Sequence, residues 1–123
     1  MQMKSNKVLL LAAFSFVSMA SIAQEITEMF KVYGNCGMCK SRIEKAAKTD
    51  AVINAAWNAE TKMLTVTYDA AKINNETIQK NIAAVGHDTD KFRADDKVYE
   101  KLPGCCLYER RSAANQNPIY SKD

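Results

Sequence analysis

Hydrophobic and polar residues alternate in three short stretches of the chain, and alternation with a period of two predicts β-strands. The clearest stripe is made by Leu64, Val66 and Tyr68. The second and third stretches are separated by a short polar turn, so we expect them to pair as a hairpin. The predicted strands cover residues 25–33, 52–58 and 62–68, with the turn at residues 58–61.

Two longer stretches repeat their apolar residues every three to four positions, which is the period of an α-helix. The first covers residues 38–48. The second begins at Asn74, a residue type that caps helices well, carries Ile78 and Ile82 on one face, and ends at Gly86. Both stretches are therefore predicted to be amphipathic helices that cover one face of the sheet.

A fourth strand is predicted over residues 88–93, although that stretch is polar. The resulting order, β-α-β-β-α-β, is the ferredoxin-like split βαβ arrangement, an α+β fold. We assign this domain to residues 24–93. Residues 94–123 follow as a short cysteine-containing C-terminal extension, in which Asp95 is expected to cap a short helix.

The N-terminus has the pattern of a secretory signal peptide. Two lysines precede a thirteen-residue apolar run, and Ser21 and Ala23 supply the small residues of a cleavage site. The run is shorter than a membrane-spanning helix, and no second run follows it. We therefore predict that residues 1–23 are removed, and that the mature protein has no membrane span and is periplasmic or secreted.

Charge and size limit the functions open to the mature chain. Without the two N-terminal lysines, the count is 15 basic against 14 acidic residues, a net charge of +1. That balance offers no basic patch for nucleic acid or for an anionic membrane. The remaining 100 residues are enough for one small domain with a modest core. We predict a binding protein and not an enzyme.

The most informative motif is the pair Cys36 and Cys39, at the turn between the first predicted strand and the first predicted helix. Two thiols three positions apart can converge on one ion. The free N–H groups and the positive dipole at the start of a helix favour thiolate over thiol, and thiolates bind soft metals. A redox pair and a structural disulfide use the same local spacing, so these alternatives stay open.

With these elements in place, residues 25–93 resemble a heavy-metal-associated (HMA) domain, the fold of small copper chaperones and of the periplasmic mercuric-ion-binding protein. The resemblance rests on the Cys-x-x-Cys motif after the first strand, on residues 64–69 (Leu-Thr-Val-Thr-Tyr-Asp), and on Ile78, Ile82 and the pair Gly86-His87.

The resemblance implies that Cys36 and Cys39 hold a soft metal ion, which we expect to be Cu(I), with Zn(II) or Hg(II) as alternatives. It also implies a partner that transports or receives the metal, and transfer by exchange of thiolate ligands. The alternatives from other classes are a thiol–disulfide redox module and a structural or interaction domain stapled by disulfides. Two observations count against the redox alternative. No tryptophan precedes Cys36, and the two prolines, Pro103 and Pro118, lie far from where a thioredoxin-like cis-proline would be needed.

Two positions depart from the family pattern. Gly34 stands two residues before the first cysteine, where the family usually has a methionine that packs beneath the loop. The nearest methionine, Met38, is expected either to shield the site or to face solvent. His87 stands after the second helix, where copper-handling members commonly carry Tyr, Lys or Phe. It is a candidate third ligand that would favour Zn(II) over Cu(I), or else a surface histidine that caps a loop.

Cys105 and Cys106 complete the four cysteines of the chain. Adjacent Cα atoms lie about 3.8 Å apart, below the usual disulfide range, so this pair is not expected to bond internally. The fourth strand should carry the chain to the pole opposite the Cys-x-x-Cys loop, near Arg93. The eleven residues that follow could span about 36 Å and return. The pair therefore either joins Cys36 and Cys39, in a four-thiolate site or a disulfide, or stays peripheral.

Overall fold

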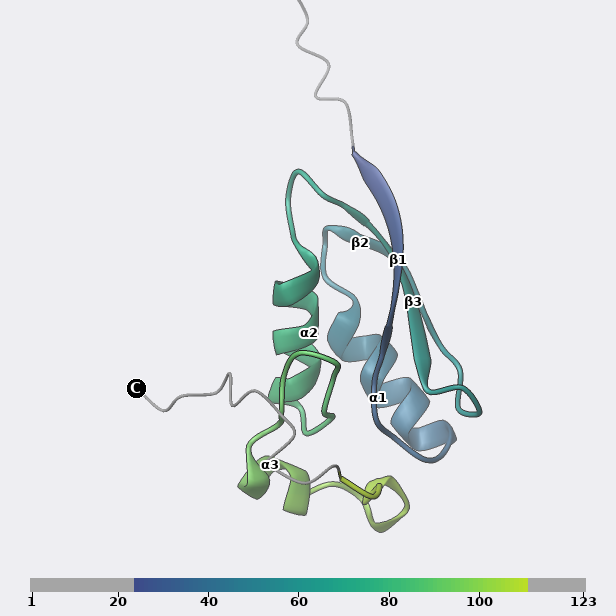
Figure 1. Cartoon of the computed structure of the whole chain (residues 1–123), viewed down its shortest axis with the longest axis vertical. Helices are drawn as coiled ribbons and strands as arrows, with labels where there is room; N and C mark the ends of the chain where they lie inside the picture. Colours follow the sequence, from purple (N-terminus) through teal and green to yellow (C-terminus); the bar gives the residue numbers. More distant parts are fainter. Residues whose placement is uncertain (1–23, 111–123) are drawn as a thin grey trace, which may run out of the picture.

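The computed structural model describes residues 24–110, in which a three-stranded sheet is covered on one face by helices (Figure 1). The predicted signal peptide lies outside the described residues. Within them, no helix is long and apolar enough to cross a membrane. The described elements are β1 (Glu25–Lys31), α1 (Gly37–Ala47), β2 (Val52–Trp57), β3 (Met63–Asp69), α2 (Asn75–Ala84), α3 (Asp96–Glu100) and the 3-10 turn η1 (Gly104–Cys106).

The sheet is antiparallel and has the strand order β1-β3-β2. The clearest predicted stripe therefore lies in the central strand, where it is covered best. Leu64, Val66 and Tyr68 are buried, while the β3 residues between them point to the opposite, partly exposed face. The three predicted strands and the β2–β3 hairpin are confirmed, with one irregularity in register between Val52 and Asn54.

Each predicted helix buries its apolar face against the sheet. Ile43 of α1 and Ile78 and Ile82 of α2 are fully buried, and each such side chain contributes roughly 1.5–3 kcal/mol to folding. The predicted start of α2 is confirmed, because the Asn74 side chain accepts a hydrogen bond of 2.8 Å from the Thr77 N–H group. Figure 1 shows α1 and α2 side by side on the same side of the sheet.

The predicted fourth strand over residues 88–93 is wrong. Only one isolated antiparallel bridge, between Val32 and Thr89, remains of it among the described residues. The Thr89 N–H group donates to the Phe92 carbonyl at 2.8 Å, and the Phe92 N–H group donates to the Thr89 hydroxyl at 3.1 Å. These two bonds close a turn, so the backbone groups that would continue a strand are used locally. The rest of the element order agrees with the predicted α+β arrangement.

The chain does not leave at the opposite pole either, so that expectation was also wrong. After the turn it folds back towards the end of the sheet that carries the β1–α1 loop (Figure 1). The Ala94 N–H group donates to the Asp88 carboxylate at 2.8 Å, six residues earlier in the chain. The helix α3 then begins at its predicted cap, because the Asp95 side chain accepts from the Lys97 N–H group at 2.8 Å.

Residues 104–110 form what we call the C-terminal strap. It begins with η1, which packs against α1. Cys106 and Tyr108 of the strap are buried in the same core as the sheet and the helices. Just before the strap, Leu102 packs against Gly86, whose φ of 107° and missing side chain allow the close approach. The position of the strap is therefore fixed by its buried side chains as well as by its own backbone turns.

Candidate metal centre

Cys36 and Cys39 lie where β1 gives way to α1. Cys36 is the N-cap residue of α1 and has an extended backbone, with φ −125° and ψ 178°. Cys39 lies in the first turn of the helix and is fully buried. The change from extended to helical backbone between them turns both side chains to one side, and their sulfur atoms lie 3.5 Å apart.

Gly34 gives this loop the room it needs. A Cβ atom at Gly34 would lie 3.0 Å from the Cys39 Cβ atom and 3.2 Å from the indole ring of Trp57. That ring is buried, and its N–H group donates to the Val32 carbonyl at 3.0 Å. Trp57 of β2 therefore packs beneath the loop, at the place where the family pattern has a methionine. No sequence pattern indicated this supporting role for Trp57.

Cys105 and Cys106 reach the same point from the C-terminal strap. The Cys36 sulfur lies 3.0 Å from that of Cys105 and 3.9 Å from that of Cys106, and the two strap sulfurs lie 4.0 Å apart. The sulfur atoms of Cys36, Cys39 and Cys106 are all within 4.8 Å of one another. Within residues 24–110 all four cysteines are unbonded thiols. The structure therefore brings the strap pair close to the loop pair, and no disulfide joins them within residues 24–110.

Exposure differs sharply among the four thiols. Cys39 and Cys106 are fully buried, Cys36 is half-buried, and Cys105 is exposed. Met38, which was expected either to shield the site or to face solvent, is 52% exposed, and its sulfur lies 4.0 Å from that of Cys105. The cluster therefore has a closed inner side and an open outer side.

The electrostatics of the cluster favour one thiolate. The side-chain hydrogen bond with Cys105, followed by the N–H group of Cys39, lowers the pKa of Cys36 to about 6, so its sulfur is charged at neutral pH. The same contact between the two sulfur atoms raises the pKa of Cys105. Burial, followed by its contact with Cys39, raises the pKa of Cys106. Binding of a cation would displace these protons, as is usual at thiolate sites.

His87 is neither at the surface nor among the clustered thiols. Its imidazole is fully buried, so the expectation of a surface histidine was wrong. The ring stacks on Tyr108, with ring centres 5.7 Å apart, and its Nδ1 atom lies 2.8 Å from the Tyr33 carbonyl. Since a carbonyl only accepts, Nδ1 carries the proton. Burial lowers the pKa of His87, which keeps the ring neutral, and Nε2 has no hydrogen-bond partner in the described part of the chain.

The strap is held beside the loop by a buried ion pair. The Arg110 guanidinium donates to both carboxylate oxygens of Asp88, at 2.8 and 3.0 Å, and to the Ala94 carbonyl at 2.7 Å. The Tyr108 hydroxyl donates to the Gly86 carbonyl at 2.9 Å and accepts from the Asp88 N–H group at 2.8 Å. These residues could not be recognised from the sequence, because no local period or motif links positions 22 residues apart.

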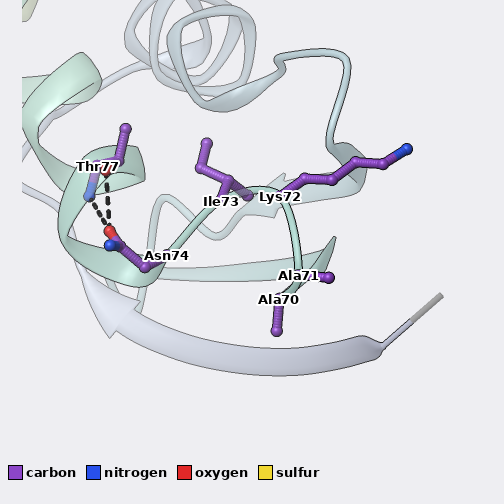
Figure 2. Close-up of a pocket in the computed structure, with 6 residues that line it drawn as sticks. All are labelled: Ala70, Ala71, Lys72, Ile73, Asn74 and Thr77. Atoms are coloured by element: carbon purple, nitrogen blue, oxygen red, sulfur yellow. Dashed lines mark hydrogen bonds between the residues drawn. The ribbon is translucent and has the colours of Figure 1, made fainter. Parts of the chain in front are cut away.

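A hollow of about 260 Å³ lies at the far end of the sheet, beside the β3–α2 connection (Figure 2). The N–H and hydroxyl groups of Thr77, which lines the hollow, both donate to the Asn74 side chain, at 2.8 and 2.9 Å. We assign it no chemistry. The lining residues are Ala70, Ala71, Lys72, Ile73, Asn74 and Thr77.

Comparisons with known proteins agree on the family. A model of the heavy-metal-associated domain matches residues 34–88. The structure of the CopZ metallochaperone is 33% identical, with a TM-score of 0.50, over 52% of this chain and 98% of CopZ. The water-soluble region of the P-type ATPase CopA from Bacillus subtilis is 30% identical, with a TM-score of 0.52, over 55% of this chain and 46% of that structure. A search among curated proteins found no match.

Proposed function

This chain belongs to the heavy-metal-associated domain family, and we propose that it binds a soft metal ion through Cys36 and Cys39 and hands that ion to another protein. The observation that carries the proposal is the cluster of sulfur atoms at the β1–α1 turn. Its ligands are thiols and no carboxylate belongs to the group, which favours soft ions over magnesium or calcium.

The ion that we propose first is Cu(I), with Zn(II) and Hg(II) as alternatives. Two matched structures support the handling of a metal ion, since one is a metallochaperone and the other is part of a P-type ATPase. The partner would be a protein that transports or receives the metal and presents thiolates of its own. The proposed location is the periplasm or the exterior, which requires that protein from the periplasmic fraction begins at Gln24 in an intact-mass measurement.

Transfer would proceed by exchange of ligands. Cys36 is half-buried and already a thiolate at neutral pH, so it is the group of the β1–α1 loop that meets an arriving ion or a partner's thiolate. Cys39 is fully buried and keeps its hold while Cys36 is replaced. In each step one metal–sulfur bond forms as another breaks, and neither the metal nor the sulfur is oxidised.

The test is substitution of each loop cysteine by serine. Cys36→Ser and Cys39→Ser should each abolish tight binding of Cu(I), measured by competition with a coloured Cu(I) chelator. Circular dichroism should show that both variants keep the fold. The matched control is Met38→Leu, which removes the exposed sulfur of the same loop and should change affinity less than about tenfold, or 1.4 kcal/mol. Parent-like binding of Cu(I), Zn(II) and Hg(II) by both serine variants would rule out the proposal.

A second candidate function is thiol–disulfide exchange, which one observation favours. The Cys36 thiolate lies 3.0 Å from the exposed Cys105 thiol, so an oxidant could join them. Free thiols should be counted by mass spectrometry after equilibration with a glutathione redox buffer, with and without Cu(I). If Cu(I) protects Cys36 and Cys39 from oxidation, the metal-binding function is supported. If the extent of oxidation is the same with and without Cu(I), the redox function is supported.

A further inference from the structure

The two strap cysteines have no part in a two-thiol carrier. They lie outside residues 34–88, which the family model matches, and they come to the loop from a different part of the chain. Cys106 is nevertheless fully buried in the core, and Cys105 lies against the Cys36 sulfur. Thiols that merely ended up near the loop would not need a dedicated set of buried contacts to keep them there.

Such a set of contacts exists. The Asp88 carboxylate, 1% exposed, is paired with Arg110 of the strap. The carbonyl of the same Asp88 accepts from the Tyr33 N–H group at 2.9 Å, one residue before the Cys-x-x-Cys loop begins. Asp88 therefore ties both the strap and the entry to the loop to one point. This fixes the strap thiols relative to the loop thiols in the absence of any ion.

The spacing of the sulfur atoms fits a metal bound by more than two of them. Metal–sulfur bonds of 2.3 Å place sulfurs about 4.6 Å apart in a line, about 4.0 Å apart in a triangle and about 3.8 Å apart in a tetrahedron. The observed separations of 3.5, 3.9 and 4.0 Å bracket the last two values. The Cys36–Cys105 separation, at 3.0 Å, is shorter, and Cys105 lies on the exposed side, where it can move outwards.

We propose that the C-terminal strap turns the two-thiol loop into a four-sulfur site, with Cys106 as the third ligand and Cys105 as the fourth. The site would then select ions that take three or four thiolates, such as trigonal Cu(I) or tetrahedral Zn(II), over ions held by two thiolates in a line. This inference rests on the proposed metal-binding function and adds to it the ligand number and the class of ion.

A four-sulfur site still has to release its ion. The four thiols differ in exposure to solvent, and this difference indicates which ligand leaves first. Cys105 is the exposed ligand, so it is the one that a partner's thiolate replaces first. One metal–sulfur bond to Cys105 breaks as one to the partner forms, and the departing Cys105 thiolate takes up a proton from water. Cys36, Cys39 and Cys106 keep the ion bound during that step.

The experiment counts sulfur ligands by X-ray absorption on the purified, reduced protein loaded with Zn(II). The parent should have four sulfur neighbours at about 2.3 Å, and Cys105→Ser and Cys106→Ser should each have three. Zn(II) affinity should fall by more than about 100-fold in Cys106→Ser, since even the loss of residues that only support a ligand costs about 10–100-fold. The matched control is Leu107→Ala, an exposed strap residue, which should leave both readouts unchanged.

Two sulfur neighbours in the parent would overturn the four-sulfur site, and this readout does not depend on any variant remaining folded. Parent-like affinity in both strap variants would overturn it as well. The loop variants separate this result from a failure of the function itself. If Cys36→Ser and Cys39→Ser lose binding while the strap variants keep it, the two-thiol function stands without the strap. If the loop variants also keep it, both proposals fail.

Discussion

The two cysteine pairs meet at one point, but the chain holds them there by different means. Cys36 and Cys39 are fixed by the start of α1, a helix of eleven residues in which the Lys40 N–H group donates to the Cys36 carbonyl at 3.0 Å. Cys105 and Cys106 sit on a three-residue 3-10 turn that has little structure of its own. Their position depends on side chains that join distant parts of the chain.

Because of this difference, the position of the loop should resist single substitutions, whereas the position of the strap should be sensitive to them. A helix start is held by many backbone bonds, so the position of the loop thiols depends less on any one side chain than that of the strap thiols does. The strap depends on a few side-chain contacts, above all the Asp88–Arg110 pair, and losing one partner leaves the other charge buried alone. We therefore expect the strap to detach before the loop is disturbed, and single substitutions should separate the two regions.

The largest effect is expected for Arg110→Ala. Breaking a buried ion pair by removing one partner costs about 3–5 kcal/mol, and Asp88 and Arg110 have side chains only 1% and 10% exposed. The free energy of unfolding, measured by urea denaturation, should fall by about that amount, and the buried Cys106 thiol should become reactive. The matched control is Lys72→Ala, which removes an exposed partner of Asp69 and should cost about 1 kcal/mol or less. Equal losses in the two variants would contradict the strap's dependence on this pair.

The same contrast explains what the sequence could predict. The β1–α1 loop, the stripe of Leu64, Val66 and Tyr68, and the cap at Asn74 follow from residues close together in the chain. A period or a capping residue identifies each of them. The fourth strand failed because Thr89 bonds back to Phe92, and a turn closed by one hydroxyl leaves no periodic signal.

The strap could not be predicted for a different reason. Asp88 and Arg110 are individually ordinary charged residues, and only the folded chain brings them together across 22 positions. His87 was expected at the surface because histidine is usually at least partly exposed. It is buried because Tyr108 of the strap covers it. Both errors arise from contacts between segments that are far apart in the sequence.

The second effect also concerns the strap side of the molecule. Gly86→Ala forces a side chain into a backbone with φ of 107°, and its Cβ atom would lie 2.9 Å from the Leu102 side chain. Left-handed backbone costs about 1–2 kcal/mol and overpacking about 1–3 kcal/mol, so a loss of roughly 2–5 kcal/mol is expected in urea denaturation. In Gly104→Ala the added Cβ meets nothing within 4 Å, and stability should change by less than about 1 kcal/mol. A reversed order of the two losses would contradict this packing.

The third effect is on the loop side. Gly34→Ala brings a Cβ atom to 3.0 Å from that of Cys39 and 3.2 Å from the Trp57 ring, so we expect a loss of about 1–3 kcal/mol and weaker metal binding as Cys39 shifts. Gly37→Ala, inside the motif itself, meets nothing within 4 Å and should leave both properties within error. Thermal denaturation and chelator competition measure the two. If Gly37→Ala weakens binding more than Gly34→Ala, the packing beneath the loop does not position Cys39.

The last prediction disturbs the fold least and compares the two cysteine pairs most directly. It concerns how the alkylation rates of the cysteines depend on pH. In the reduced, metal-free protein the Cys36 rate with iodoacetamide should rise as pH passes about 6 and then level off, because the reactive form is the thiolate. Cys106 should stay unmodified while it is buried. Peptide mapping by mass spectrometry, between about pH 4 and pH 9, gives both rates in one experiment.

The control for this measurement is Cys105→Ala, which removes the side-chain hydrogen bond that contributes most to the lowered pKa of Cys36. The midpoint for Cys36 should move up, towards the value of about 8.5 that is usual for a free thiol. Arg110→Ala should do the same if the strap swings away, and should also expose Cys106 to the reagent. A midpoint near 8.5 in the parent would mean that the strap and the loop do not share a proton, and the two pairs would then be independent.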